Sequence, residues 1–407
     1  MKFCMVTTFF PPHNFGGDGL FVRQLSAELA ARGHEVDVVY GVDAWRVLAG
    51  RGSVAPDEEA PPGVRVHRLE SPLGRLGPLL IQQTGRPLFA RRALERVLGR
   101  GFDVVNFHNI SLAGGPGVLR LGRGVKLYTL HEHWWVCPTH VLFKYTGELC
   151  TERACVRCML AHGRPPQVWR ASRSWMARCL EEVDLVLAPS RATADRHRAW
   201  MAEAGADVPL ELVPPYVPPL PPAAARPAGL PARYFLYVGR VTAAKGTGFL
   251  VDALRARPDY PLVVVGGGDA EQELRRRAPA NVAFLGRVPR EALAAYYAGA
   301  TALVFPSLCA ETFGLSACEA LSLGVPVVTS RCGGAEEIVA DGAGLVYGSA
   351  EELLAHLDRL WSDPALRDGL GRRGAERYRE LYTPEAYLER YLAAVERARE
   401  HHRARGA

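Results

Sequence analysis

The chain has 407 residues, of which 48% are hydrophobic and 23% are charged. This composition is typical of a soluble globular protein, and the length exceeds what one hydrophobic core usually serves, so we expect two domains. No apolar run approaches the roughly 18 residues of a membrane span, and Pro11 and Pro12 cut the apolar start too short for a signal peptide. We therefore expect a cytoplasmic protein whose cysteines are reduced.

The first half of the chain is the basic half. Residues 1–200 carry 26 Lys and Arg against 18 Asp and Glu, whereas the remaining residues carry 23 against 25. A basic half fits an anionic acceptor, or peripheral contact with the anionic inner face of a membrane. Nucleic acid is not expected as a partner, because the sequence contains no DNA- or RNA-binding motif.

Strand-like and helix-like runs alternate along this first half. Residues 20–32 form an amphipathic, helix-like run between two of the predicted strands. These strands are residues 2–7, 35–40, 64–69, 104–107, 126–130 and 185–188. Alternation of this kind predicts βαβ units and a parallel sheet.

A proline-rich linker separates the first series from a second one. The predicted linker spans residues 216–232 and is stiff because of its prolines. It divides an N-terminal domain of residues 1–215 from a C-terminal domain of residues 233–382. The second series has predicted strands at residues 234–238, 262–265, 282–285, 302–305 and 325–329.

The two series predict an α/β protein made of two doubly wound parallel-sheet domains that face a cleft. Ligands of such sheets bind at the carboxyl ends of the strands. The most informative loop of this kind carries Glu311 and Gly314, and Glu319 lies about one turn into the following helix. Free backbone N–H groups and the positive end of a helix dipole would let an anion bind there. Two carboxylates beside such a site suit a ligand that carries both phosphate and sugar hydroxyls.

These residues belong to a set of motifs that resembles the retaining glycosyltransferases of family 4. The motifs fall over most of the chain, and their combination is specific although each is weak alone. They are Phe10-Pro11-Pro12, Gly16-Gly17, residues 32–36, Val238-Gly239-Arg240, Lys245-Gly246, residues 264–268, Glu311, Glu319, Gly324-Val325-Pro326 and Gly333-Gly334. The resemblance implies the GT-B fold, in which two Rossmann-like domains face a cleft. The last helix, here about residues 383–407, would pack back onto the N-terminal domain.

The resemblance implies roles for four charged residues of the C-terminal domain. Glu311 faces the transferred sugar, and Glu319 binds the ribose hydroxyls, because carboxylates accept paired hydroxyl hydrogen bonds. Arg240 and Lys245 are the cations that stabilise the departing diphosphate. Lys245 is the only lysine after residue 200 in a chain of four lysines and 45 arginines. The use of lysine at this position indicates that a compact point charge is required there.

The other expected donor contacts come from the same resemblance. His131, at the end of a predicted strand, matches a family histidine near the reacting sugar and completes the predicted catalytic set. His108 is a weaker candidate, since a lone histidine is more often a core residue. Asp18 stands near the position where the family commonly has a glutamate. The residues expected to bind the nucleotide sugar are Gly16, Gly17, Gly239, Gly266, Val288, Phe313, Gly314, Leu315 and Glu319.

The implied reaction is sugar transfer from a nucleotide sugar, with UDP- or GDP-sugars as the expected donors, to an acceptor hydroxyl with retention of configuration. The implied mechanism is same-face attack, in which the leaving phosphate takes the acceptor's proton, and a nucleophilic Glu311 is the alternative. No Asp-x-Asp pair follows a predicted strand, so we expect no metal for catalysis. The acceptor would be a glycan, a lipid-linked glycan or a small molecule, in the synthesis of polysaccharide, glycolipid or a glycosylated metabolite.

Two further functions remain open at this point. The first is an NAD-linked oxidoreductase, although no Gly-x-Gly-x-x-Gly opens the first helix with an acidic residue about 20 positions later. The second is a catalytically silent glycosyltransferase-like partner protein. The presence of Glu311, Glu319, Arg240 and Lys245 argues against this second alternative.

Four cysteines lie close together in the sequence: Cys137, Cys150, Cys155 and Cys158. In a reduced compartment such a group suggests a structural zinc site, and the last two have the usual ligand spacing. A matching first pair is missing, but three nearby histidines could substitute. A disulfide, an iron–sulfur cluster and plain reduced thiols are the alternatives.

Residues 86–100 place apolar side chains on one helical face and arginines on the other. This pattern fits a helix that lies on anionic lipid headgroups. A crossover helix that covers the sheet has the same pattern, and we favour that interpretation.

Overall fold

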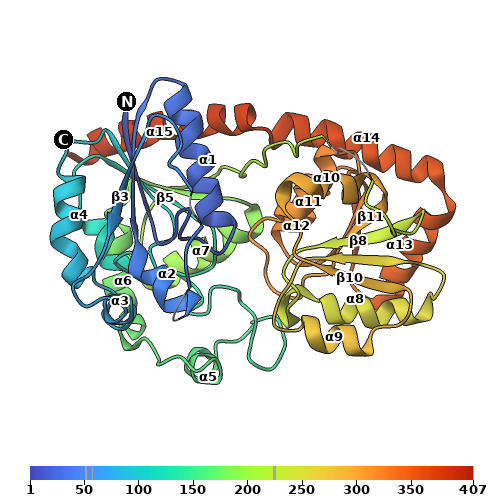
Figure 1. Cartoon of the computed structure of the whole chain (residues 1–407). Coiled ribbons are helices and arrows are strands. Elements are labelled where there is room, and N and C mark those ends of the chain that lie inside the picture. The colour runs from blue at the N-terminus through green and yellow to red at the C-terminus, as the bar shows by residue number, and fades with distance from the viewer. Residues whose placement is uncertain (51–52, 57, 223–225, 407) are drawn as a thin grey trace.

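The computed structural model describes residues 1–50, 53–56, 58–222 and 226–406. It has two lobes, each with a parallel sheet between helices, and the C-terminal helices run along one side of both lobes (Figure 1). Within these residues, no helix is both long enough and apolar enough to cross a bilayer.

The first lobe contains a seven-stranded parallel sheet in the order β3-β2-β1-β4-β5-β6-β7. Its strands are β1 (Lys2–Thr7), β2 (Glu35–Gly41), β3 (Val64–Leu69), β4 (Val104–Phe107), β5 (Val125–Thr129), β6 (Leu185–Ala188) and β7 (Leu210–Leu212). The six predicted strands agree with these bounds to within one residue. The edge strand β7 was not predicted, because three residues are too few to show a pattern.

Helices cover both faces of this sheet. One face packs against α1 and α15, and the other packs against α4, α6 and α7. The helical segments of the lobe are α1 (Gly17–Ala31), α2 (Val42–Ala49), α3 (Leu76–Thr84), η1 (Leu88–Ala90), α4 (Arg91–Leu98), η2 (Pro116–Arg120), α5 (Cys155–Ala161), η3 (Val168–Ala171), α6 (Arg173–Leu180) and α7 (Arg191–Ala204).

Helix α4 lies within the amphipathic run at residues 86–100 and is a crossover helix that covers the sheet, as we favoured from the sequence. Its apolar residues Leu94, Val97 and Leu98 are buried in the core on one face of the sheet. The apolar face of this helix is therefore not available to a membrane.

The second lobe contains a six-stranded parallel sheet in the order β10-β9-β8-β11-β12-β13. Its strands are β8 (Tyr234–Val238), β9 (Leu262–Val265), β10 (Val282–Gly286), β11 (Ala300–Phe305), β12 (Val327–Ser330) and β13 (Gly344–Tyr347). Its helical segments are η4 (Ala243–Lys245), α8 (Thr247–Ala253), η5 (Leu254–Ala256), α9 (Glu271–Arg277), α10 (Arg290–Ala298), α11 (Leu315–Ser322), α12 (Gly334–Ile338), α13 (Ala350–Ser362) and α14 (Pro364–Leu381). Strand β13 is the one strand of this sheet that was not predicted.

The chain passes from one hydrophobic core to the other between two consecutive residues. Tyr216 packs in the core of the first sheet, and Val217 packs in the core of the second. The Val217 N–H donates to the carbonyl of Tyr382 at 3.0 Å, and the Val217 carbonyl accepts the Tyr378 hydroxyl at 2.7 Å. The start of the proline-rich segment is thus fixed to the second lobe. Residues 223–225 of the predicted linker lie outside the described residues.

The last helix, α15 (Pro384–Gly406), packs against the first lobe. Its residues Tyr387, Leu388 and Tyr391 belong to the first core. The Asn106 amide, on β4, donates to the Tyr391 hydroxyl at 3.1 Å. This helix therefore ties the two lobes together a second time.

Candidate active site

A cleft of about 610 Å³ lies between the lobes, at the carboxyl ends of the central strands of both sheets. Most of the residues predicted to contact the donor line it. These are Gly16, Gly17, His131, Gly239, Arg240, Lys245, Glu311, Phe313, Gly314, Leu315 and Glu319. Residues far apart in the sequence thus surround one space.

Two predicted donor contacts, Gly266 and Val288, do not belong to this lining. Gly266 has a φ of +131°, and a Cβ there would lie 1.8 Å from the carbonyl oxygen of Gly239. Gly266 therefore allows the end of β9 to pass close to the cleft-lining Gly239. Val288 packs against the core of the second sheet. Neither residue is therefore placed to contact a donor in this cleft directly.

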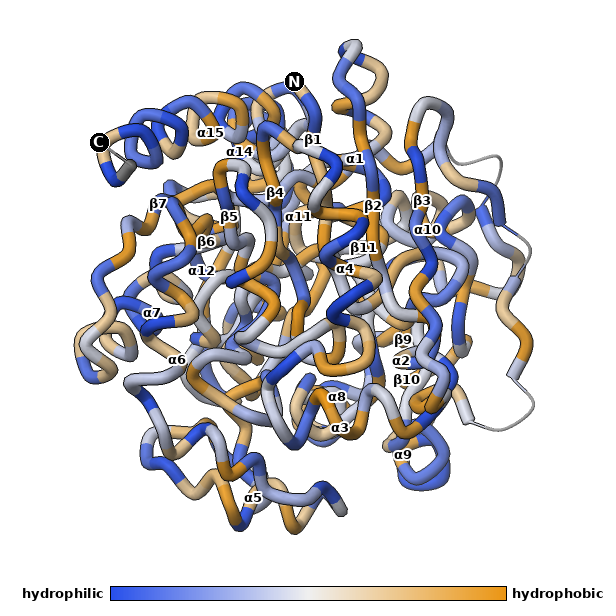
Figure 2. Tube along the Cα trace, turned by 90° about the vertical axis from the view of Figure 1, so that its left-hand side faces the viewer, coloured by the Kyte–Doolittle hydropathy of each residue, from blue (hydrophilic) through white to orange (hydrophobic). Residues whose placement is uncertain are grey.

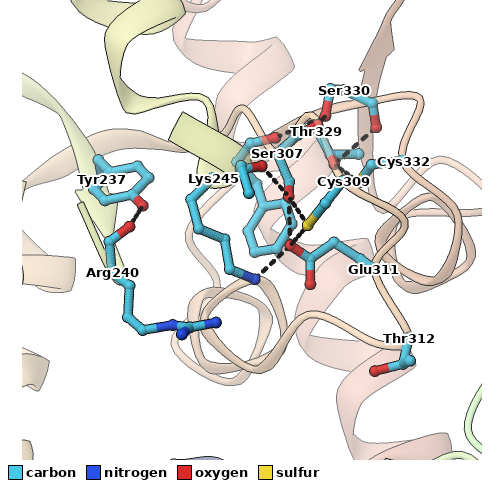
Figure 3. A network of polar contacts seen from close by, with 12 residues as sticks. Tyr237, Arg240, Lys245, Ser307, Cys309, Glu311, Thr312, Thr329, Ser330 and Cys332 are labelled. Carbon is cyan, nitrogen blue, oxygen red and sulfur yellow. Dashed lines mark hydrogen bonds and ion pairs between the residues drawn. The ribbon is translucent and has the colours of Figure 1, made fainter. Parts of the chain in front are cut away.

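On the second-lobe wall, Lys245 and Glu311 form an ion pair (Figure 3). The Lys245 Nζ lies 2.5 Å from the Glu311 Oε1, and the Ser307 hydroxyl donates to the same oxygen. The Cys309 thiol lies 3.6 Å from it. Burial lowers the pKa of Lys245, but the neighbouring Glu311 carboxylate raises it, and the net shift is upward. The structure therefore holds a charged ammonium at a fixed point in the cleft.

The position of Lys245 depends on the glycine that follows it. Gly246 has a φ of +68°, and a Cβ there would lie 1.8 Å from the carbonyl oxygen of Pro306. The Leu308 N–H donates to the carbonyl of Ala244 at 2.9 Å, which joins the two loops. The loop after β8 therefore lies directly on the loop after β11, and this contact places Lys245 beside Glu311.

Arg240 supplies a second cation to the same wall. Its exposed side chain runs toward the side on which the Lys245 ammonium lies (Figure 3), and among the described residues it forms no ion pair. Its backbone carbonyl accepts the Tyr237 hydroxyl at 2.6 Å, which fixes the loop from which the side chain extends. Arg240 can thus turn its charge toward an anionic ligand without breaking a protein contact.

Glu319 lies in α11 and is held by two side chains of α10. The Tyr297 hydroxyl donates to the Glu319 Oε2 at 3.0 Å, and the Arg290 Nε lies 3.8 Å from the Oε1. Burial raises the pKa of Glu319, although Tyr297 and Arg290 act in the opposite direction. A buried carboxylate that keeps accepting capacity toward the cleft can bind a pair of hydroxyl groups.

Two helices begin at the cleft, one from each lobe. Helix α11 starts at Leu315 directly after Gly314, and α1 starts at Gly17 directly after Gly16. The first N–H groups of a helix have no partner within the helix, and its dipole is positive at this end. The two helix ends therefore add partial positive charge to that of Arg240 and Lys245, which suits a diphosphate.

The first-lobe wall contributes a histidine pair and a carboxylate. The His131 Nε2 lies 2.9 Å from the His108 Nδ1, so one of the two rings donates a hydrogen bond to the other. Burial lowers the pKa of His131, although Asp18 acts in the opposite direction, and burial also lowers the pKa of His108. The Asn109 amide donates to the Asp18 Oδ2 at 3.1 Å, which holds this carboxylate at the cleft.

Hydrogen bonds also join the two lobes beside the cleft. The Thr312 hydroxyl donates to the carbonyl of His131 at 3.1 Å. The Glu337 carboxylate accepts from the backbone N–H groups of Arg191 and Ala192 at 2.8 and 2.9 Å. These two N–H groups open α7, so the carboxylate of one lobe caps a helix of the other.

Several residues of the site were not predicted. Ser307 follows the end of β11 and bonds to Glu311, and Tyr297 orients Glu319 from a different helix. The position of Ser307 after a strand end is a signal that could have been used. Tyr297 gave no signal, because its partner is 22 residues away and is reached only through the packing of α10 on α11.

The zinc site that the cysteine spacing suggested stays a prediction. In the part of the chain that the structure describes, no three His, Cys, Asp or Glu side chains are grouped so that they could hold an ion. The four cysteines are free thiols: Cys137, Cys150, Cys155 and Cys158. The Cys137 Sγ lies 3.1 Å from the Thr139 hydroxyl, and the Cys150 thiol donates to the carbonyl of Glu152 at 3.4 Å. Two of the thiols thus have other polar partners.

Comparisons with known proteins agree on one family. The profile of the family described as Glycosyl transferases group 1 matches residues 226–377, and that of Glycosyltransferase Family 4 matches residues 15–217. A D-inositol 3-phosphate glycosyltransferase of Nocardiopsis dassonvillei is 30% identical over 389 residues, which cover 86% of this chain and 83% of that protein. The D-rhamnosyltransferase WbpZ of Pseudomonas aeruginosa is 39% identical over 160 residues, which cover 37% of this chain and 42% of that protein.

The solved structure of sucrose-phosphate synthase from Thermosynechococcus elongatus is similar as well. Its TM-score is 0.74 at 26% identity, over 97% of this chain and 99% of that one. The chain therefore belongs to the group 1, family 4 glycosyltransferases and has the GT-B fold. It is a glycosyltransferase of the hexosyltransferase class, which confirms the predicted family and enzyme class and sets aside the oxidoreductase.

Proposed function

We propose that the enzyme transfers a sugar from a nucleoside diphosphate sugar to an acceptor hydroxyl with retention of anomeric configuration. The observation that carries this proposal is the grouping of Arg240, Lys245, Glu311 and Glu319 around one cleft. The two cations suit the diphosphate of such a donor, and the two carboxylates suit the hydroxyl groups of its ribose and its sugar.

The donor would bind along the second-lobe wall. Glu319 would accept the ribose hydroxyls, and the diphosphate would lie between Arg240, Lys245 and the first turn of α11. These fixed positive charges are present before the reaction, so they stabilise the diphosphate as its negative charge grows. The sugar would then lie toward Glu311 and His131.

Transfer breaks the bond between the anomeric carbon and the diphosphate oxygen and forms one to the acceptor oxygen on the same face. The acceptor's proton passes to the departing phosphate oxygen, so no protein base is needed. Glu311 is a poor candidate for a nucleophile here, because one of its oxygens is bonded to both Lys245 and Ser307. Its proposed role is to position Lys245 and to accept a hydrogen bond from the sugar.

A donor screen tests this function. Thermal shifts with UDP, GDP, ADP and TDP would identify the nucleotide, with UDP or GDP expected to stabilise the protein. Release of the diphosphate from matching nucleotide sugars would then be measured with and without acceptors. If no nucleotide stabilises the protein and no donor is consumed, the proposed function is wrong.

The stereochemistry needs its own experiment. Proton NMR of the first product formed should show the anomeric configuration of the donor. Mass spectrometry of the enzyme during turnover should show no attached sugar. A sugar on Glu311 would replace same-face attack by the two-step alternative.

A further inference from the structure

The lower edge of the first lobe in Figure 1 carries a surface that is both apolar and basic. Helices α3 and α5 lie at this edge in Figures 1 and 2, and η3 contacts α3. Its exposed apolar residues are Leu76, Leu79 and Leu80 of α3, Val156 and Leu160 of α5, and Val168 of η3. Together with the exposed residues Arg75, Arg157 and Arg164, we call them the basic apolar surface.

The basic apolar surface has a fixed shape. The Trp169 indole N–H donates to the carbonyl of Gln82 at 2.9 Å, and the Gln83 amide donates to the carbonyl of Pro165 at 3.4 Å. The Arg170 guanidinium lies 4.9 Å from the ring centre of Trp169 and packs into the lobe. Helix α3 and the segment after α5 are therefore joined, although about 80 residues separate them in the sequence.

The apolar residues of this surface are unusually open to solvent. Val168 is 77% exposed, Leu160 is 60% exposed and Leu76 is 59% exposed. Single exposed apolar residues are normal on a folded protein, but a group of six on adjoining elements marks an interaction site.

The two segments that carry these residues contain charge of one sign, although Glu203 of α7 pairs with Arg153 and Arg173. Residues 71–94 and 153–180 together contain ten arginines and no aspartate or glutamate. Of the basic apolar surface itself, Arg157 and Arg164 form no ion pair with any residue that the structure describes. A partner that combines negative charge with an apolar layer would fit this surface.

We propose that the basic apolar surface binds an anionic lipid bilayer. The arginines would contact lipid phosphates, while the leucines and valines enter the boundary between headgroups and acyl chains. A second copy of the chain is a poor partner, because a two-fold contact would bring like charges together. The membrane element is thus α3 with α5 and η3, and not the apolar face of α4.

The surface is connected to the cleft by one segment of chain. His131, Glu132 and His140 line the cleft, and α5 begins at Cys155 on the basic apolar surface. Membrane binding at this edge would bring a lipid-linked acceptor near the first-lobe wall. This last step rests on the proposed function, whereas vesicle binding itself is measured without donor or acceptor.

Vesicle sedimentation tests the proposal. The full chain should bind vesicles that contain about one third phosphatidylglycerol, should bind phosphatidylcholine vesicles much more weakly, and should detach as salt is raised. The double variants R157Q/R164Q and L160S/V168S should each weaken binding by about tenfold or more. Matched controls on the second lobe, R276Q/R372Q and L285S/L323S, replace exposed residues of the same kind and should bind like the unchanged protein.

Nucleoside diphosphate binding serves as the folding control, and it should be unchanged in all four variants. The proposal is overturned if the unchanged protein ignores anionic vesicles, or if the control variants lose binding equally. Loss in R157Q/R164Q with full binding by L160S/V168S would also overturn it, because the surface would then be a general polyanion site. Absence of nucleotide binding in every protein would contradict the proposed function instead.

Discussion

The ammonium of Lys245 lies 2.5 Å from the carboxylate of Glu311, on the wall where the donor is proposed to bind. The two residues come from loops after different strands, and the close contact at Gly246 brings these loops together. Because the Lys245 ammonium is already paired with Glu311, a bound diphosphate would compete with this carboxylate for the ammonium. This relationship leads to separate expectations for the cation and for the carboxylate.

Removal of the cleft cations should slow transfer. Lys245→Ala and Arg240→Ala should each lower turnover by about 100-fold or more, since each removes a fixed charge that stabilises the departing diphosphate. Steady-state assays with the identified donor would measure this effect. Arg372→Ala, at an exposed position of α14, is the control and should keep normal turnover. Full turnover in the double variant K245A/R240A would contradict the role of both residues.

Neutralisation of Glu311 should separate binding from chemistry. Glu311→Gln keeps the size of the side chain but releases Lys245 from its ion pair, so the nucleoside diphosphate should bind at least as tightly as before. Turnover should nevertheless fall by roughly tenfold to 100-fold, because the sugar loses a charged acceptor and Lys245 its fixed position. Calorimetry with the diphosphate and initial-rate assays would show the two effects separately. Weaker diphosphate binding would mean that Glu311 helps Lys245 to hold the phosphate.

Binding of the donor should depend on the ionisation of Glu319. Burial raises the pKa of this carboxyl group above its ordinary value of 4.5. Because the ionised form accepts the ribose hydroxyls, affinity should fall as the pH falls through the raised pKa, and binding near that pH should release a proton. Calorimetry with an intact nucleotide sugar avoids the titration of a terminal phosphate. Glu319→Gln should bind about 5- to 100-fold more weakly and should lose this pH dependence; an unchanged dependence in this variant would assign it to another group.

The strands and most of the cleft lining could be predicted because their patterns lie within short stretches of the sequence. Most of the strands are apolar runs, as in parallel sheets covered on both faces, and the glycines and charged residues follow their carboxyl ends. The residues that orient the site depend on contacts between distant elements. The bond from Tyr297 to Glu319 and the bond from Thr312 to His131 follow from packing and carry no local pattern.

The cysteine group shows what spacing alone leaves open. Its spacing resembles a ligand set, but spacing along a loop does not determine where the side chains lie. The structure directs the Cys137 and Cys150 thiols to a hydroxyl and a carbonyl. Likewise, the amphipathic pattern of α4 could not show whether its apolar face met lipid or the sheet, and burial of Leu94 and Val97 decides for the sheet.

A buried pair of histidines should make stability depend on pH. The rings of His133 and His197 stack with their centres 5.7 Å apart, and both side chains are buried. Burial lowers the pKa of His133 to about 3 and that of His197 to about 4, from an ordinary value of 6.5. The unfolded chain therefore binds protons below pH 6.5 that the folded chain excludes, so stability is complete above this pH and is lost as the pH falls toward the folded values.

As the pH falls from about 7.5 to about 5, protonation of each histidine in the unfolded chain should lower the free energy of unfolding by about 2 kcal/mol. Urea unfolding at a series of pH values would measure the loss. The variant H133N/H197Q should be less stable at neutral pH, but its stability should fall by about 4 kcal/mol less over the same range, because both titrating groups are gone. His162→Gln replaces an exposed histidine and should leave the pH profile as it was. A parallel fall in the double variant and the unchanged protein would show that the acid sensitivity arises elsewhere.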